Sequence, residues 1–289
     1  MTRAQEDAHV CGVVPHEHDP RFVAQHLAAY AFIKPQVAGK RILEIGFGSG
    51  YGADYLADVA KDVLAVDLAP GNIPRAEAAY QRPNLRFCHM DATRLSLPSD
   101  SMDVVYSFQV IEHIPEPLLL AYVSEISRVM RPEGFACLST LNLAHNRKPG
   151  RPYEKLIYHE KEFTAEELET VLTRAFPVVT MHGLHPTRRH RVMQRLKKWG
   201  FDKLKPSRLN PIARFYRQVS VEDFTVSRDV SRAALDLLAV CRKVPASSSS
   251  PRLDSSYSGA QQKAGERPEP FRFRHSAPTL MVGASESNL

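Results

Sequence analysis

The sequence of 289 residues lacks the features that would mark a membrane or secreted protein. It has no run near the ~20 apolar residues that span a bilayer. Its first twenty residues are polar and contain acids, unlike a secretory signal peptide. With 43% hydrophobic and 24% charged residues, the chain has enough apolar side chains for an ordinary core. These properties predict a cytoplasmic protein.

Cysteine is also scarce, and it is not arranged for metal binding or disulfides. The four cysteines are widely spaced, with no C-x-x-C pair, at Cys11, Cys88, Cys137 and Cys241. One group of residues could bind a metal, but it lies in a polar terminal arm. It consists of His9, Cys11, His16 and His18. We interpret the cysteines as reduced thiols and predict no metal.

The stretch Arg41 to Gly52, RILEIGFGSGYG, is where glycine gathers. Ile and Leu before the first glycine indicate a strand, and Tyr51 to Ala60 has helical composition. Glycines at alternate positions would let a ligand approach the main chain and the helix N-terminus closely. The same pattern also fits the G-x-G-x-x-A turn of dinucleotide-binding proteins, so the turn alone leaves both ligands open.

Glu44, two residues before the first glycine, favours one of these ligands. A carboxylate at a strand end would repel a pyrophosphate, whereas it suits a ligand with a cationic amino acid and a sulfonium. This ligand is S-adenosylmethionine, and the segment resembles motif I of class I methyltransferases.

Two further acids follow predicted strands. Val63 to Leu68 is an apolar run containing Asp67, which lies 21 positions beyond Gly46 and is placed to accept ribose hydroxyls. Asn84 to Met90 is a third strand, followed by Asp91. Each aspartate could instead cap a neighbouring helix or turn.

The remaining pattern alternates strands and helices. The expected strands are Met102–Val110, Phe135–Leu141, Val178–Leu184 and Ala234–Val244, and the expected helices are Pro20–Ile33, Leu118–Met130 and Thr164–Phe176. Thr164 and Glu167 form a capping box at the start of the last helix. A long polar loop, Asn142–Glu162, replaces a short connection, and such loops are usually functional.

The motifs EIGFGSG, Asp67, Asp91 and DVVYSFQVIEHI, with the segment EISRVMRPEGFACLST, occur in an order that resembles one family. This family is the class I S-adenosylmethionine-dependent methyltransferases of the methyltransferase type 11 kind, with a VIEH-type fourth motif. The resemblance implies an α/β fold with a doubly wound, Rossmann-like, seven-stranded and mostly parallel sheet. Its last strand would be antiparallel, with a basic helical insertion before it.

The resemblance also implies a set of cofactor residues. It places Glu44, Gly46, Gly48 and Gly50 around the methionine, Asp67 on the ribose and Asp91–Ala92 on the adenine, with Phe108 and Gln109 at the sulfonium and Phe47 and Leu68 also in the cofactor site. Related sequences often have Glu where this chain has Gln109. The fourth motif lacks an N-P-P-Y or D-P-P-Y box, which disfavours a base nitrogen as acceptor.

Methyl transfer to a hydroxyl requires a base, and two histidines are candidates. His113 follows the fourth strand and has a suitable pKa range, and His159 lies in the loop YHEKEFT. Either histidine could instead have a structural role bonded to the backbone. Glu112 is interpreted as an orienting or structural acid.

Positive charge is concentrated in Pro186–Arg217, where eleven Lys or Arg accompany a single acid, although the whole chain carries only +6. One helical stripe there is apolar, at Val192, Met193, Leu196 and Trp199. This segment could contact an anionic membrane, a phosphorylated or lipid-linked acceptor, or nucleic acid, or it could be a packed lid.

The sequence therefore predicts a methyltransferase acting on a small or lipid- or sugar-linked acceptor, at oxygen. Its alternatives are an RNA-directed enzyme and a non-catalytic binding protein. We expect a flexible arm at 1–19, a methyltransferase domain at 20–244 with the basic insertion at 186–231, and a disordered Ser- and Pro-rich tail at 245–289. The expected location is the cytoplasm, with peripheral contact to a membrane.

Overall fold

The computed structural model describes residues 13–147, 150, 152–203, 210–244 and 257–258. These residues contain one nine-stranded sheet with the order β3-β2-β1-β4-β5-β8-β6-β7-β9. The strands are β1 Arg41–Ile45, β2 Asp62–Asp67, β3 Leu85–His89, β4 Met102–Phe108, β5 Met130–Leu141, β6 Val178–Pro186, β7 Phe224–Ser227, β8 Asp236–Arg242 and β9 Tyr257–Ser258.

The first five strands pair in parallel, and β8 is antiparallel to both β5 and β6. The seven strands from β3 to β6 in this order confirm the predicted sheet with an antiparallel last strand. Two further strands extend it, because β7 and then β9 pair beyond β6. The basic insertion is thus not wholly helical, since Phe224 and Val226 are buried and give β7 a strand-like alternation.

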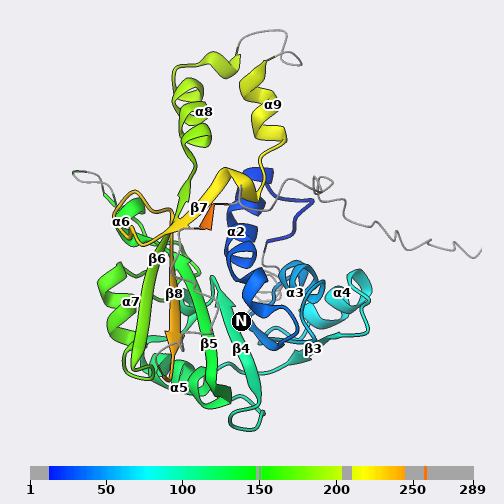
Figure 1. Cartoon of the computed structure of the whole chain (residues 1–289). Coiled ribbons are helices and arrows are strands. Elements are labelled where there is room, and N and C mark those ends of the chain that lie inside the picture. The colour runs from blue at the N-terminus through cyan, green and yellow to red at the C-terminus, as the bar shows by residue number, and fades with distance from the viewer. Residues whose placement is uncertain (1–12, 148–149, 151, 204–209, 245–256, 259–289) are drawn as a thin grey trace, which may run out of the picture.

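Most helices lie on the two faces of this sheet, whereas α8 and α9 project beyond it (Figure 1). Their bounds are α2 Pro20–Val37, α3 Tyr51–Ala57, α4 Asn72–Ala79, α5 Leu119–Val129, α6 Leu143–Asn146, α7 Ala165–Leu172, α8 Arg188–Lys198 and α9 Pro211–Arg217. Alternate strand residues face opposite layers. Ile42 packs in the core with α2 and α3, whereas Leu43 packs in the core with α5 and α7.

Side chains cap the starts of α2 and α7. The Asp19 side chain accepts a hydrogen bond from the Arg21 amide at the start of α2. Thr164 and Glu167 form the reciprocal capping box of α7. None of the helices among the described residues is long and apolar enough to cross a membrane.

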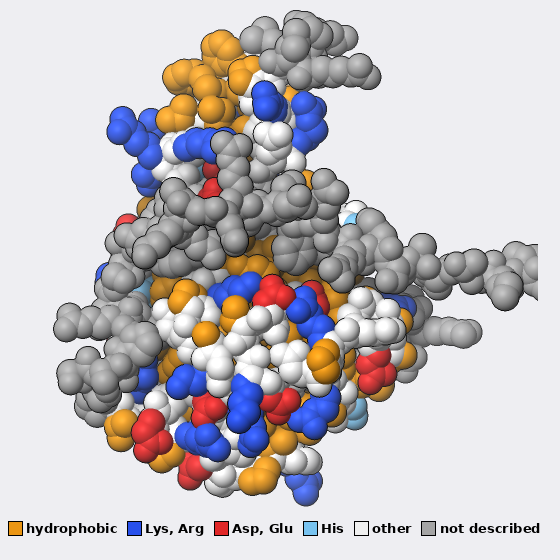
Figure 2. All heavy atoms as spheres, turned by 45° about the vertical axis from the view of Figure 1, so that its right-hand side comes forward, with side chains coloured by type: hydrophobic (Ala, Val, Ile, Leu, Met, Phe, Trp, Pro, Cys, Tyr) orange, Lys and Arg blue, Asp and Glu red, His pale blue; other side chains and the backbone are white. Residues whose placement is uncertain are grey.

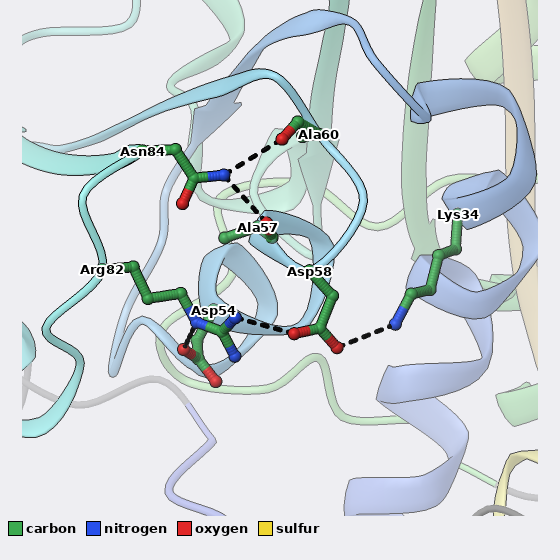
Figure 3. A network of polar contacts seen from close by, with 7 residues as sticks. All are labelled: Lys34, Asp54, Ala57, Asp58, Ala60, Arg82 and Asn84. Carbon is green, nitrogen blue, oxygen red and sulfur yellow. Dashed lines mark hydrogen bonds and ion pairs between the residues drawn. The ribbon is translucent and has the colours of Figure 1, made fainter.

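A polar network fixes α3, the helix that follows the glycine turn (Figure 3). Arg82 forms ion pairs with Asp54 and Asp58, and Lys34 from α2 reaches Asp58 at 3.2 Å. The Asn84 side chain donates to the carbonyls of Ala57 and Ala60 at 2.9 and 3.0 Å. These contacts hold α3 against the start of β3, so the turn before it has a defined position.

The basic insertion forms a projecting helical hairpin, which consists of α8, α9 and the short helix Phe201–Lys203 (Figure 1). It leaves the sheet directly after β6 and returns through β7. His190 anchors its base, because this buried ring packs among Phe215, Tyr216 and Phe224 at 5.2 to 6.2 Å. The hairpin is therefore attached at both ends to paired strands.

Several sequence expectations lie outside the described residues. They include the first part of the flexible arm, with His9 and Cys11, and nearly all of the Ser- and Pro-rich tail. Within the described part of the chain, Cys88, Cys137 and Cys241 are free cysteines.

Candidate functional site

The glycine turn lies at the carboxyl end of β1, beside the end of β4. Gly46, Gly48 and Gly50 have φ of 77°, 56° and 85°, a region that favours glycine. A Cβ on Gly46 would lie 2.4 Å from a Val110 methyl carbon, so this position has no room for a side chain. Phe47 is buried and packs on Phe87, with ring centroids 4.9 Å apart. The turn is therefore rigid and has its main chain close to the strand ends.

Glu44 lies beneath this turn, in contact with α2. Its two carboxyl oxygens accept from the Tyr30 hydroxyl at 2.7 Å and the Tyr106 hydroxyl at 3.3 Å. Its side chain is buried, and burial raises the pKa of Glu44 to about 7. A carboxyl group held in this way can gain negative charge when a cationic ligand approaches.

Asp67 connects the ends of β1 and β2. One carboxyl oxygen accepts from the Gly48 amide and the other from the Ala69 amide, each at 2.8 Å. Burial raises the pKa of Asp67 above its usual value. The Asn72 side chain also hydrogen-bonds to this carboxylate. At least one lone pair remains, so the group can still accept from a ribose hydroxyl. The Leu68 side chain beside it is 67% exposed and lies at the open edge.

Asp91 lies at the same edge, one strand further along. The Met90 amide donates to the Asp67 carbonyl at 3.0 Å, which brings the two aspartates into neighbouring positions. Asp91 is exposed and accepts from the Thr93 amide and hydroxyl through a single oxygen, and Ala92 is half-buried. The glycine turn, Asp67 and Asp91 form a continuous polar edge that suits an adenosine with an attached amino acid.

Phe108 and Gln109 end β4 on the other side of the turn. Gln109 has φ of 57°, which is uncommon for a residue with a side chain. Its backbone amide donates to the Ser139 carbonyl at 2.9 Å. Phe108 is buried and meets Tyr30 edge to face at 4.9 Å. Sequence reasoning predicted β4 to continue to Val110, and the left-handed residue is the reason it stops earlier.

A small polar cavity adjoins these two residues, and it includes groups that sequence reasoning missed. Its lining includes Gln25, His26, Phe108, Gln109, Ser139 and Asp236. Gln25 of α2 donates to the Asp236 carboxylate at 2.8 Å, and burial raises the pKa of Asp236 to about 6. Gln25 and Asp236 are 211 positions apart, so no sequence motif links them.

The two candidate histidines meet next to this edge. His113 belongs to the short helix Ile111–His113 after β4, and His159 comes from the long loop. Their rings lie 4.9 Å apart, edge to face. A ring nitrogen of His113 is 2.9 Å from the Tyr158 carbonyl oxygen. The loop is attached here because the Glu160 and Lys161 amides donate to the Glu112 carbonyl.

Glu162 orients His159 and was not predicted. Its carboxylate lies 2.8 Å from His159 Nδ1 and also accepts from the Leu156 amide and the Tyr153 hydroxyl. Burial alone would raise the pKa of Glu162, but the hydrogen bonds from Tyr153 and His159 hold it below its usual value. The sequence signal that could have predicted this contact is the position of Glu162, three residues after His159.

Glu112 is the second acid of this region, and it is fully buried. Burial raises the pKa of Glu112 to about 8. This burial agrees with the structural acid that the sequence suggested.

Comparisons with known proteins relate part of the chain to methyltransferases. Residues 43–138 match the family model described as a methyltransferase domain. A probable S-adenosylmethionine-dependent methyltransferase of Mycolicibacterium smegmatis is 38% identical over 52% of this chain and 57% of its own length. A ubiquinone biosynthesis O-methyltransferase of Cereibacter sphaeroides is 34% identical over 36% of this chain and 42% of its own length. The chain thus spans about half the length of the curated relatives it matches.

A solved structure shares the fold. The S-adenosylmethionine dependent methyltransferase from Mesorhizobium loti has a TM-score of 0.51 at 19% identity, covering 76% of this chain and 97% of its own. The cofactor of this family is S-adenosyl-L-methionine, and the turn, Glu44 and Asp67 fit it. Residues 43–138, which include the glycine turn, Asp67 and Asp91, are thus similar to a methyltransferase domain.

Proposed function

We propose that this chain transfers a methyl group from S-adenosylmethionine to a hydroxyl oxygen of a small or lipid-linked acceptor. One observation carries the proposal: His159, held by the buried Glu162, lies beside His113 at the carboxyl edge of the sheet. A hydroxyl oxygen must lose its proton as it is methylated, and an imidazole is suited to accept that proton near neutral pH.

The Glu162 carboxylate determines the tautomer of the neutral His159 ring. A carboxylate can only accept a hydrogen bond, so His159 Nδ1 carries the proton and Nε2 keeps its lone pair. Bound S-adenosylmethionine supplies an electrophilic methyl group on its sulfonium. The His159 imidazole would accept the proton that the acceptor hydroxyl loses when its oxygen takes this methyl group, and the sulfur would keep the electron pair of the broken carbon–sulfur bond. The protein mainly provides alignment.

A groove supports an acceptor on the loop side of this group. Its lining includes Leu143, Arg147, Tyr153, Lys155, Lys161 and Glu162. Because Tyr153 donates to Glu162, the groove reaches the side chain that orients His159. The groove contains three cationic side chains with the acids Glu160 and Glu162 beside them, which favours a polar acceptor.

We further propose that the helical hairpin contacts an anionic membrane surface. Three of its large apolar side chains are exposed: Val192 by 41%, Trp199 by 72% and Phe201 by 45%. Figure 2 shows apolar side chains gathered at the end of the hairpin with Lys and Arg beside them. Exposed aromatic and basic side chains together are typical of interfacial helices. This arrangement favours a binding surface over a packed lid.

A labelled-methyl assay tests the function. The chain is incubated with methyl-labelled S-adenosylmethionine and a cell extract, and the labelled product is identified. We expect a product labelled at oxygen, with turnover reduced ~10²-fold or more in His159→Gln. The matched control is His145→Gln, since His145 contacts a backbone carbonyl rather than a carboxylate.

Three results would contradict the proposal. A product labelled at carbon or nitrogen would exclude the oxygen acceptor. Unaltered turnover in both His113→Gln and His159→Gln would exclude a histidine base. Absence of any labelled product with intact cofactor binding would favour the non-catalytic binding protein.

A further inference from the structure

Glu112 has an environment that its structural role does not explain. Its side chain is 0% exposed, and in the described part of the chain neither carboxyl oxygen has a hydrogen-bond partner. The hydroxyl of Thr140, also buried, lies close enough to interact with this carboxyl group, but the pair does not meet hydrogen-bond geometry. A buried carboxyl group without hydrogen bonds is costly, so it needs a proton or a cation beside it.

Two histidines lie where such a cation would bind. One ligand atom each from Glu112, His113 and His159 lies within 4.8 Å of the other two. Ligands of a tetrahedral zinc ion with bonds of ~2.0–2.1 Å are separated by roughly 3.3 Å. The side chains would therefore need to close by about 1–1.5 Å. His113 is exposed and His159 belongs to a long loop, so small movements of both are feasible.

The contacts of the two rings are those that metal-bound histidines usually make. The Nδ1 atom of His159 contacts the Glu162 carboxylate, and that of His113 contacts the Tyr158 carbonyl. Such outer contacts fix the ring orientation and leave Nε2 as the coordinating atom. His159 thus has both a candidate metal ligand atom and a carboxylate that supports it.

We propose that Glu112, His113 and His159 bind a divalent transition-metal ion such as Zn²⁺. Two imidazoles and one carboxylate suit zinc, manganese or iron(II), whereas Mg²⁺ and Ca²⁺ prefer sites made of oxygen alone. Three protein ligands leave an open position for an acceptor hydroxyl. The sequence expectation of no metal considered ligands close in sequence, and His113 and His159 are distant in sequence.

The role of the ion rests on the proposed function, but its binding does not. A hydroxyl coordinated to the ion would release its proton to solvent water more readily, so the ion would perform the activation assigned to the imidazole. The two histidines would then hold the ion rather than accept the proton directly.

Isothermal titration of metal-free protein with Zn²⁺, without cofactor or acceptor, tests the site. We expect one ion per chain and affinity weakened by about tenfold or more in Glu112→Gln and in His159→Gln. His145→Gln is the matched control and should bind as the unchanged protein does. The variant H16Q/H18Q tests competition from the N-terminal histidines and should also bind normally.

A second measurement records the visible absorption of the protein with Co²⁺ in place of Zn²⁺. We expect visible absorption bands that are lost in Glu112→Gln, while the thermal unfolding of the metal-free variant shows that it folds. Absence of stoichiometric binding, or equal affinity in Glu112→Gln, His159→Gln and His145→Gln, would overturn the metal site. Full methyl transfer in the presence of a chelator would overturn its role alone, and failure of methyl transfer with intact Zn²⁺ binding would overturn only the proposed function.

Discussion

The proposed cofactor end and the proposed acceptor end of the candidate site are built in different ways. At the cofactor end, the glycine turn, Asp67 and Asp91 each lie at or directly after a strand end. At the acceptor end, His113 meets His159 through a long loop, and Gln25 meets Asp236 across 211 positions. The first end depends on backbone geometry, whereas the second depends on side-chain contacts between distant segments. Substitutions should therefore affect the two ends differently.

The largest expected effect is on the backbone of the cofactor end. Gly46→Ala should lower the free energy of unfolding by about 2–5 kcal/mol, because it combines a left-handed backbone with overpacking. The added Cβ would lie 2.4 Å from Val110. The control Gly39→Ala also has positive φ, at 69°, but nothing lies within 4 Å of its Cβ. Chemical denaturation measures the free energy of unfolding of both variants. Equal losses in Gly46→Ala and Gly39→Ala would show that the Val110 contact is unimportant.

A pH dependence should reveal Glu44, the buried acid of the cofactor end. Burial raises the pKa of Glu44 to about 7 from its ordinary value of 4.5. The folded chain then holds this proton more tightly than the unfolded chain does, so stability falls as the pH rises through that window. We expect the loss to reach about 3 kcal/mol and to shrink in Glu44→Gln.

The measurement is thermal unfolding at pH 5 and pH 8, with the exposed Glu169→Gln as control. S-adenosylmethionine should reduce this pH dependence, because its ammonium group favours the charged form of Glu44. Identical pH profiles for the unchanged protein and Glu44→Gln would contradict the assignment.

A moderate effect is expected for Asp67→Asn. Loss of the charge should weaken S-adenosylmethionine binding by ~1–3 kcal/mol while the acceptor end stays intact. Calorimetry measures the affinity, and Asp62→Asn, at the opposite end of the same strand, is the control. Wild-type affinity in Asp67→Asn would argue against the ribose contact.

The smallest effect is expected at the hairpin. Trp199→Ala should weaken binding to anionic vesicles by about tenfold or less, because it removes a large aromatic ring that is 72% exposed. The exposed Leu120→Ala, on α5, is the matched control. Salt-sensitive retention on RNA without vesicle binding would favour the RNA-directed alternative instead.

Sequence reasoning located the strand ends well, because each combines apolar residues with a turn residue. The Arg41–Ile45 strand was predicted at its observed bounds. Glu162 and Asp236 were missed as site residues, since their partners become visible only when the loop and β8 are folded. The left-handed conformation of Gln109 was also missed, because the sequence contains no glycine there to indicate it.

The attachment of the hairpin has a consequence for the acceptor. Because β6 is parallel to β5 and runs directly into the hairpin, the hairpin rises from the same edge as the site (Figure 1). The α8 helix has 11 residues, so it is ~16 Å long. Membrane contact at the hairpin tip would hold the catalytic edge at about that height above the lipid headgroups. An acceptor would then have to carry its hydroxyl on a long polar head, or leave the bilayer before it reacts.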